Sequence, residues 1–333
     1  MNKVNLALNI CTYKREHNLK NNLEVLKNSE FFNPDNPHYY NKLHIFVIDN
    51  ASELVLEDFP NLHFFHNSNT GGSGGFQRGI EEIRKISGFT HVIFMDDDVK
   101  FEMSSFYILF DFLEKVDDSN ADRPVAGRML DLDNPNIQWT AAEKWNTGDI
   151  QHVEFLRDIM DPDNPYTPGK VIYDADADYG GFWFCCYPYS FVKDNDILPF
   201  FLHCDDVEYG LRCGKPPIII EGVHVWHETW DKKINPLILY FDCRNSLFIN
   251  DIYAFVSGYG IKHWLMIAKE YHEKREYKYE KAIIFALFDY YKGINFLKSF
   301  ELKKIQKRIY KNNNQSIYMK IALAFISLRN MIG

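Results

Sequence analysis

Short apolar runs alternate with segments of helical periodicity along the first hundred residues. Four of these runs predict β-strands, at residues 4–10, 43–48, 62–65 and 91–95. Residues 16–27 place apolar side chains at helical spacing, and a second helix is predicted to end near residue 86. Such a β-α-β-α-β order is typical of a parallel sheet with helices on both faces. We therefore predict an α/β fold with a mostly parallel central sheet.

The alternation becomes less regular beyond residue 101. Further strands are predicted near residues 124–129, 182–187 and 217–225, and residues 161–169 form a loop rich in Pro, Asp and Asn. From about residue 240 the pattern is long and helical, with lysines and aromatic residues interleaved. The sequence thus predicts an α/β domain over residues 1–250 and a helical, basic C-terminal region over residues 251–333.

Composition agrees with a folded protein that has a large core. The chain has 333 residues, of which 46% are hydrophobic and 16% aromatic, so it can bury one large core or a core with an appended module. The six cysteines show no CxxC pair, and the first residues do not resemble a secretory signal. No apolar stretch approaches the length that a membrane-spanning helix needs. We therefore predict a cytoplasmic protein with reduced thiols.

Charge is divided unevenly along the chain. Residues 260–333 hold 15 Lys and Arg against 6 Asp and Glu, a net charge of +9. Because the whole chain has a net charge of −9, the first 259 residues have a net charge of −18. The acidic part argues against a catalytic face that binds nucleic acid. The basic part suits a peripheral contact with an anionic membrane, and the amphipathic residues 316–332 suit its interface. A solvated helical appendage, packing on the α/β domain or contact with a second subunit explains the same pattern.

Three consecutive carboxylates follow the strand predicted at residues 91–95. The apolar residues 92–94 are typical of a strand buried on both faces, which does not tolerate adjacent charges, so Asp96, Asp97 and Asp98 must lie at its end. Strand ends of this kind border the ligand crevice of α/β sheets. Alternation makes Asp96 and Asp98 converge while Asp97 faces away. Mg²⁺ or Mn²⁺ with a diphosphate is the first hypothesis, and a solvated acidic turn is the alternative.

A glycine cluster at residues 71–79 offers a second element of chemistry. Its density lets the backbone approach a ligand closely, and its position before a predicted helix offers N–H groups to an anion. Arg78 is a plausible partner for phosphate. A dinucleotide-binding fingerprint would follow the first strand, whereas this cluster follows the third, so a Rossmann dehydrogenase is disfavoured. A flexible linker is the other interpretation.

A second acidic pair and two histidines lie later in the chain. Asp205 and Asp206 could provide a general base, although acidic residues are also favoured in the first turn of a helix. In the strand predicted near residue 224, alternation turns His224 one way and His227 the other, so one of them could join a metal. A histidine on a strand is more often structural.

Eight short motifs follow one another in order over roughly residues 4–250. They are Thr12-Tyr13-Lys14-Arg15, Val47-Ile48-Asp49-Asn50, residues 69–75 with Arg78-Gly79, Met95-Asp96-Asp97-Asp98, residues 180–184, Asp205-Asp206-Val207-Glu208, Val225-Trp226-His227 and residues 240–245. Together they resemble family 2 glycosyltransferases of the GT-A fold, and most closely the bacterial galactofuranosyltransferases that use UDP-galactofuranose.

The resemblance implies a donor site and a metal site. It implies that the donor is held by Thr12, Arg15, Asp49, Gly72, Ser73, Gly74, Gly75, Arg78 and Asp97. It also implies that Mn²⁺ or Mg²⁺ is bound by Asp96, Asp98 and His227. Asp97 should tolerate substitution better than its two neighbours if the alternation holds.

The resemblance further implies the groups that meet the acceptor. Asp206 is similar to the base that deprotonates the acceptor hydroxyl, and Asp205 lies beside it. Trp183 would provide an aromatic platform for sugar rings, and Trp139 and Glu143 would face the acceptor.

These roles predict an inverting, metal-dependent transfer of a sugar to a hydroxyl of a bacterial glycan or lipid-linked oligosaccharide. The polymerising relatives carry an additional N-terminal β domain and can have two tryptophans where this chain has only Trp183, so we expect addition of one or a few sugars. Transfer of rhamnose, galactopyranose or glucose is the first alternative. A nucleotidyltransferase and a non-catalytic nucleotide- or carbohydrate-binding protein are the others.

Overall fold

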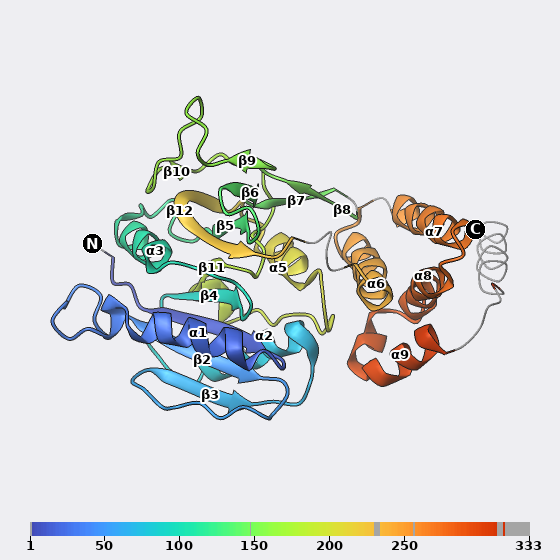
Figure 1. The fold of residues 1–333 in the computed structure, drawn as a ribbon, viewed down its shortest axis with the longest axis horizontal. Helices are drawn as coiled ribbons and strands as arrows, with labels where there is room; N and C mark the ends of the chain where they lie inside the picture. Colours follow the sequence, from blue (N-terminus) through green and yellow to red (C-terminus); the bar gives the residue numbers. More distant parts are fainter. Residues whose placement is uncertain (1, 147, 230–233, 256, 312–315, 317–333) are drawn as a thin grey trace. The chain divides into compact units, whose positions relative to one another are not determined.

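The computed structural model describes residues 2–146, 148–229, 234–255, 257–311 and 316 (Figure 1). The chain divides into two compact units. The sheet unit comprises Met1–Trp145, Ile150–Phe201 and Asp205–Thr229. The helical unit comprises Asn146–Asp149, Leu202–Cys204 and Trp230–Gly333.

The sheet unit is built on a mixed, mostly parallel sheet. Its strands are β1 Leu6–Thr12, β2 Leu43–Asp49, β3 Leu62–His66, β4 His91–Asp96, β5 Val125–Asp131, β6 Ile137–Thr140, β9 Arg157–Asp158, β10 Val171–Ile172, β11 Cys185–Pro188 and β12 Ile218–His227. The order is β10-β12-β5-β11-β4-β1-β2-β3; in addition, β6 pairs with β5, and β9 pairs with β6. β1 pairs in parallel with both β2 and β4, and β12 pairs in parallel with β5. The predicted α/β sheet is confirmed.

β11 is the strand that makes the sheet mixed. It lies antiparallel between β4 and β5, so that Cys185 is paired with Phe94 on one side and with Ala126 on the other. A separate two-stranded sheet is formed by β7 Glu143–Asn146 and β8 Asp149–His152. The sequence located the strand that contains β11 but not its direction, because a buried run of four residues carries no signal for orientation.

Five α-helices of the described residues belong to the sheet unit, and they bury their apolar faces in its core. They are α1 Glu16–Lys27, α2 Gly71–Ile83, α3 Met103–Lys115, α4 Tyr189–Val192 and α5 Asp205–Cys213, with a short 3₁₀ turn η1 at Glu30–Phe32. α2 packs on β1 and β2, whereas α3 packs on β12 (Figure 1). The core between them is aromatic, and Phe94 stacks on Phe182 with ring centroids 4.6 Å apart.

The glycine cluster is helical, which corrects the prediction that it precedes the helix. α2 begins at Gly71, so the cluster forms its first turns. Gly75 and Gly79 lie one turn apart and face β1. A Cβ on Gly75 would lie 2.1 Å from Cys11 Sγ, and one on Gly79 would lie 1.9 Å from Asn9 Oδ1. The missing side chains therefore serve close packing between the helix and the strand, which outweighs the low helix propensity of glycine.

Replacing Gly79 with alanine should destabilise the sheet unit. The new methyl group would displace the Asn9 side chain, whose Nδ2 donates a buried hydrogen bond of 2.9 Å to the carbonyl of Phe76. We expect a loss of about 1–3 kcal/mol in the free energy of unfolding, measured by urea denaturation. Glu81→Ala, at an exposed position of the same helix, is the matched control. Equal stability of the two variants would contradict this account of the packing.

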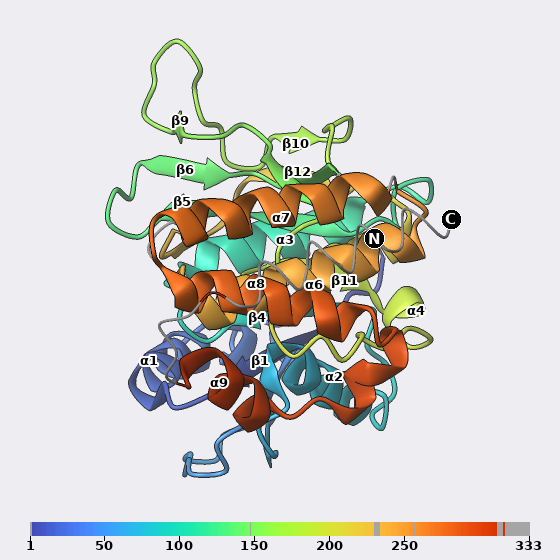
Figure 2. The same ribbon diagram turned by 90° about the vertical axis from the view of Figure 1, so that its right-hand side faces the viewer.

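Apart from residues 146–149 and 202–204, the helical unit follows the sheet unit along the chain (Figure 2). Its helices are α6 Pro236–Ile252, α7 Ser257–Glu273, α8 Tyr277–Tyr290 and α9 Leu302–Tyr310, with a 3₁₀ segment η3 at Ile294–Ser299. α6 begins where Asn235 Oδ1 accepts from the N–H groups of Leu237 and Ile238, and it packs on α7 and α8. α6 therefore belongs to the same compact unit as α7 and α8.

The three lysines of α9 face away from its packed side, whereas Arg308 Nη1 donates to the buried Asp289 at 2.9 Å. Ile305 and Ile309 are buried, whereas Lys303, Lys304 and Lys307 are exposed. Over the described ranges every helix is too short or too polar to cross a bilayer. The amphipathic stretch predicted at 316–332 lies outside the described residues, except for residue 316.

Candidate functional site

The carboxyl ends of three strands bring the predicted site residues together in the sheet unit. β1 ends at Thr12, β4 ends at Asp96 and β12 ends at His227. Cys11 of β1 is paired with Asp96 of β4. The backbone after Asp98 then pairs with β12, because Lys100 and Trp226 exchange N–H···O hydrogen bonds of 2.8 and 2.7 Å. This bridge carries the acidic segment across the sheet to His227.

Asp96, Asp98 and His227 form a cluster with metal-ligand geometry. One donor atom from each lies within 4.8 Å of the other two. His227 Nε2 is 3.2 Å from Asp98 Oδ1 and 3.9 Å from Asp96 Oδ2. Hard divalent cations prefer carboxylate oxygens, and a neutral imidazole nitrogen is a common third ligand. The sequence argument that Asp96 and Asp98 converge therefore agrees with the structure.

The orientation of His227 gives a direct test of whether a metal fits this cluster. The ring is only 2% exposed, and Nδ1 lies 2.8 Å from the carbonyl oxygen of Glu228. A carbonyl can only accept, so Nδ1 carries a proton and donates it to this bond, which leaves Nε2 as the ring atom that faces the two carboxylates. A metal-ligating histidine usually donates its other ring N–H to a carbonyl or carboxylate in this way. The donor set thus fits Mn²⁺ or Mg²⁺.

Asp97 is buried, which does not fit the expectation that it tolerates substitution. Its side chain is 2% exposed and accepts a hydrogen bond of 2.9 Å from Arg15 Nη1. Burial raises the pKa of Asp97, and the nearby Arg15 opposes that shift. Arg15 also lies 3.2 Å from Asp98 Oδ2. Arg15 therefore balances part of the negative charge of Asp97 and Asp98. Replacing Asp97 would remove the buried partner of this guanidinium.

Asp49 has a structural role that the sequence did not predict. The side chain is fully buried, and its oxygens accept from the backbone N–H groups of Ala51, Glu53 and Leu54 at 2.8 to 2.9 Å. Burial opposes ionisation, but these hydrogen bonds lower the pKa of Asp49 below its ordinary value. In the structure the carboxylate holds the turn after β2, and its contact with the donor stays a prediction. Thr12, paired in register with Asp49, is also buried.

The start of α2 is tied to β1 through Asn50, a residue that the sequence analysis did not single out. Asn50 Nδ2 donates to the carbonyl of Gly71 at 2.8 Å and to Cys11 Sγ at 3.2 Å. Ser73 is buried, whereas Gly72 and Gly74 are half-buried. Asn50 is part of the motif Val47-Ile48-Asp49-Asn50, in which the sequence analysis assigned a role to Asp49 alone.

Arg78 turns toward carboxylates of its own helix. It forms an ion pair with Glu82 and lies 3.5 Å from Glu81 Oε2. Its guanidinium carbon also lies 6.0 Å from the centre of the Phe65 ring. The structure therefore gives Arg78 partners that the predicted contact with phosphate would have to replace.

Asp205 and Asp206 begin α5, after a backbone of unusual conformation. Asp206 Oδ1 accepts from the N–H of Val207 at 2.8 Å. The pKa of the Cys11 thiol is raised first by burial and then by the carboxylates of Asp97, Asp96 and Asp205. Asp205 thus shares the electrostatic surroundings of the acidic segment at β4. A helix N-terminus stabilises negative charge, so the pair suits both the capping and the catalytic interpretation.

The three residues expected near the acceptor differ in exposure. Trp139 is half-buried, and its ring packs on His152 and Phe155 with centroids 5.4 and 5.1 Å away. Glu143 is buried and pairs with His152 at 2.8 Å. Trp183 is only 3% exposed.

Trp183 is buried in the structure, and its role as a platform for sugar rings stays a prediction. Its Nε1 donates to the carbonyl of Gly127 at 2.8 Å, so the ring is held within the sheet unit. Phe155, which is 48% exposed beside Trp139, was not identified from the sequence because it lies in an irregular segment between two short strands.

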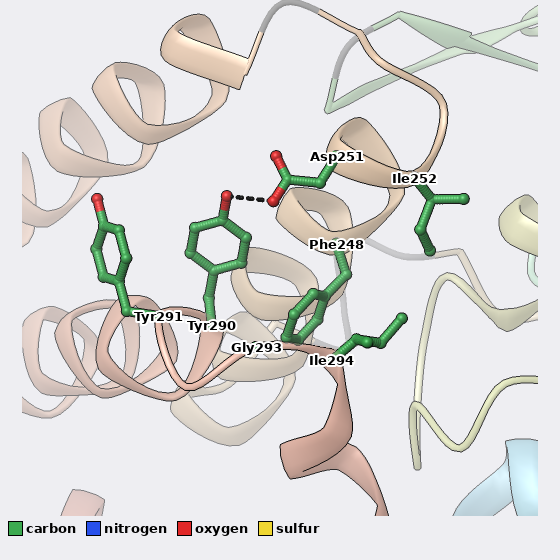
Figure 3. A pocket seen from close by; sticks show the side chains of 7 residues that line it. All are labelled: Phe248, Asp251, Ile252, Tyr290, Tyr291, Gly293 and Ile294. Atoms are coloured by element: carbon green, nitrogen blue, oxygen red, sulfur yellow. Dashed lines mark hydrogen bonds between the residues drawn. The ribbon is translucent and has the colours of Figure 1, made fainter. Parts of the chain in front are cut away.

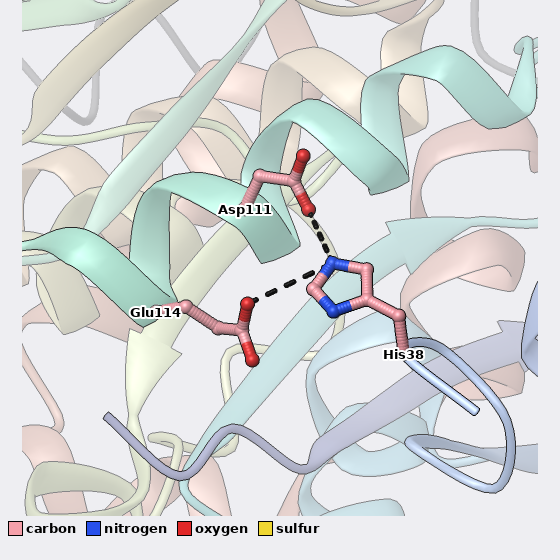
Figure 4. Close-up of side chains that lie close together, drawn as sticks. All are labelled: His38, Asp111 and Glu114. Carbon is pink, nitrogen blue, oxygen red and sulfur yellow. Dashed lines mark hydrogen bonds and ion pairs between the residues drawn. The ribbon is translucent and has the colours of Figure 1, made fainter. Parts of the chain in front are cut away.

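A second group with metal-type donors lies on α3. Asp111 and Glu114 are one turn apart, and His38 Nε2 lies 3.1 and 3.7 Å from their oxygens (Figure 4). The histidine and Asp111 are 45% and 40% exposed, and Asp111 Oδ1 also accepts from Tyr39. His38, Asp111 and Glu114 therefore form an exposed group on the surface of a helix. Asp96, Asp98 and His227 lie instead where strand ends converge.

A hollow of about 400 Å³ is present in the helical unit. Phe248, Tyr290 and Tyr291 line it, and Tyr290 Oη donates to Asp251 Oδ2 at 2.6 Å (Figure 3). Its described lining contains one carboxylate and no basic side chain, so it does not offer the charges that a diphosphate requires.

Comparison with known proteins agrees with the fold and the motifs. Residues 8–168 match Glycosyl transferase family 2. Galactofuranosyltransferase GlfT2 of Mycobacterium tuberculosis is 30% identical over 221 residues, which are 60% of this chain and 32% of that protein. Galactofuranosyltransferase GlfT2 of Mycolicibacterium smegmatis is 26% identical over 278 residues, 74% of this chain and 41% of that protein. The chain therefore spans less than half the length of these two relatives.

A solved structure of S. aureus TarS 1-349 in complex with UDP-GlcNAc has a similar fold. Its TM-score is 0.50 at 13% identity, and the match covers 97% of this chain and 92% of that one. At this identity the likeness concerns the fold alone. The motif order, the sheet and the two sequence relatives agree with one another: residues 8–168 are similar to family 2 glycosyltransferases, and the chain resembles two galactofuranosyltransferases.

Proposed function

We propose that this protein is an inverting, metal-dependent glycosyltransferase that moves galactofuranose from UDP-galactofuranose to a hydroxyl of a bacterial glycan or lipid-linked oligosaccharide. The observation that carries the proposal is the arrangement of Asp96, Asp98 and His227, in which Nε2 of His227 faces two carboxylates. The similarity to two galactofuranosyltransferases supports the choice of sugar. Transfer of another hexose or of rhamnose is the alternative.

The residues at the strand ends would have complementary roles. Asp96, Asp98 and His227 would hold Mn²⁺ or Mg²⁺, which as a Lewis acid neutralises charge on the departing UDP. The N–H groups at the start of α2 would face the diphosphate, since a helix N-terminus favours anions. Arg15, which is half-exposed beside Asp98, supplies a positive charge near the same place.

The acceptor would be activated by a carboxylate of α5. In a single displacement the nucleophile attacks the face of the anomeric carbon opposite the leaving group, which inverts its configuration. Asp206 would accept the proton of the attacking hydroxyl as the new C–O bond forms and the bond to UDP breaks. Trp139 and the exposed Phe155 would offer aromatic surface to acceptor sugars.

The donor can be identified by thermal shift followed by turnover. With Mn²⁺ present, we expect UDP-galactofuranose to raise the melting temperature more than UDP-galactopyranose, UDP-glucose or dTDP-rhamnose, because binding to the folded state alone stabilises it. The same donor should release UDP when a glycan acceptor is added. Release of pyrophosphate would indicate a nucleotidyltransferase instead. A shift with every donor but no transfer to any acceptor would favour a non-catalytic binding protein.

A further inference from the structure

The segment before Asp205 has a backbone conformation that amino acids other than glycine seldom adopt. Phe201, His203 and Cys204 have φ angles of +74°, +63° and +65°. Such a conformation is strained for a residue with a side chain and persists only where its surroundings hold it. The chain enters α5 directly from this segment, so the strain lies at the first turn that presents Asp205 and Asp206.

Within the helical unit, this segment is held by a side chain of α6. Asn245 Nδ2 donates to the carbonyl of Leu202 at 2.8 Å and to that of His203 at 2.9 Å. His203 Nδ1 also lies 2.6 Å from Asp242 Oδ1, one turn earlier on α6. Asn245 is fully buried. Two adjacent carbonyls of a strained backbone are thus satisfied by one amide group.

The Asn245 amide is itself fixed in orientation. Arg244 Nε donates to Asn245 Oδ1 at 2.9 Å, and an arginine can only donate, so Nδ2 must face the two carbonyls. Arg244 is fully buried over the rings of Tyr240 and Phe300, with its guanidinium carbon 5.2 and 4.8 Å from their centroids. Tyr240 Oη in turn donates to Asp289 of α8 at 2.8 Å. A buried network of this kind rigidifies the groups at its end.

We infer that Asn245 is a positioning residue for the carboxylates of Asp205 and Asp206. It acts through the main chain, since only Cys204 separates His203 from Asp205. The inference rests on the proposed function, because Asn245 would hold the proposed base of that reaction in place. A displacement of about 1 Å at a reacting group can reduce rate by about 10²-fold, so a support for this backbone sets the rate of transfer.

Asn245→Asp is the sharpest test, because it keeps an acceptor for Arg244 and removes both donors to the loop. We expect the variant to lower kcat by about 10- to 100-fold, with KM for the UDP-sugar and the affinity for UDP changed less than about twofold. Asn250→Asp is the matched control, since Asn250 is also buried on α6. It should keep kcat near that of the wild type even if it unfolds at a lower temperature.

Two further measurements separate positioning from general stability. Amide hydrogen exchange at residues 202–206 should accelerate in Asn245→Asp and not in Asn250→Asp. Adding Cys204→Gly to Asn245→Asp should restore part of the lost kcat, because glycine adopts the left-handed backbone without strain.

The outcomes distinguish this inference from the proposed function. Equal loss of kcat in Asn245→Asp and Asn250→Asp, or unchanged exchange at residues 202–206, would overturn the positioning role. Wild-type turnover in Asn245→Asp would do the same while leaving the proposed function intact. If the wild-type chain transfers no sugar, the proposed function fails, and accelerated exchange in Asn245→Asp would then still demonstrate the support of the backbone.

Discussion

Asp206→Asn should reduce sugar transfer by about 10²- to 10⁴-fold while donor binding survives, because the amide keeps the shape of the carboxylate but cannot accept a proton. Asp206 lies in the first turn of α5, and its Oδ1 accepts from the N–H of Val207. The amide oxygen of asparagine can accept the same hydrogen bond, so the helix should remain folded. Turnover with UDP-galactofuranose and calorimetric titration of UDP would measure the two properties separately.

Asp194→Asn is the control for this substitution. Asp194 is 72% exposed and lies 3.8 Å from Lys193, so its replacement removes a carboxylate of the sheet unit without touching the strand ends. Its turnover should match that of the wild type. Near-normal turnover of Asp206→Asn would remove Asp206 from the role of base and direct attention to Asp205.

Removal of divalent cations should abolish transfer. Neutralising charge on a departing diphosphate is worth several kcal/mol, so EDTA treatment is expected to lower the rate by about 10²-fold or more, and Mn²⁺ or Mg²⁺ should restore it. His227→Ala should lose most of the affinity for Mn²⁺ in calorimetry, because it removes the nitrogen that faces Asp98 at 3.2 Å.

The exposed group on α3 supplies a matched control for the metal site. His38→Ala removes the histidine from the other set of metal-type donors, and we expect it to bind Mn²⁺ and to turn over like the wild type. If His38→Ala loses the metal and His227→Ala keeps it, the assignment of the cluster at β4 is wrong. Full activity after exhaustive EDTA treatment would contradict metal dependence altogether.

Periodicity predicted those parts of the fold in which side-chain burial follows a simple rule. The strand predicted at residues 91–95 is β4, and the helix predicted at residues 16–27 has the bounds of α1. Alternation along β12 also separated His224 from the buried His227. Each of these features depends on neighbours in sequence, which a pattern records directly.

Features that depend on distant partners were the ones that the sequence did not reveal. The glycines of α2 were predicted to precede the helix, since their helical role arises from contact with Asn9 and Cys11 of β1. Asp49 is a different case, because its partners are the nearby backbone N–H groups of residues 51, 53 and 54, and hydrophobic periodicity does not record such a turn. Trp183 is buried, and its Nε1 donates to the carbonyl of Gly127 on β5, a partner far away in the sequence.

The partner of His227 has a consequence for how the proposed metal ligand is encoded. Its Nδ1 is oriented by the carbonyl of Glu228, and every amino acid at that position would supply the same atom. Mutation of the neighbouring side chain therefore cannot delete the group that selects the tautomer. The backbone after β12 therefore determines which ring nitrogen of His227 carries the proton. A shift of that backbone would change the position of the proton, whereas replacement of the Glu228 side chain would not.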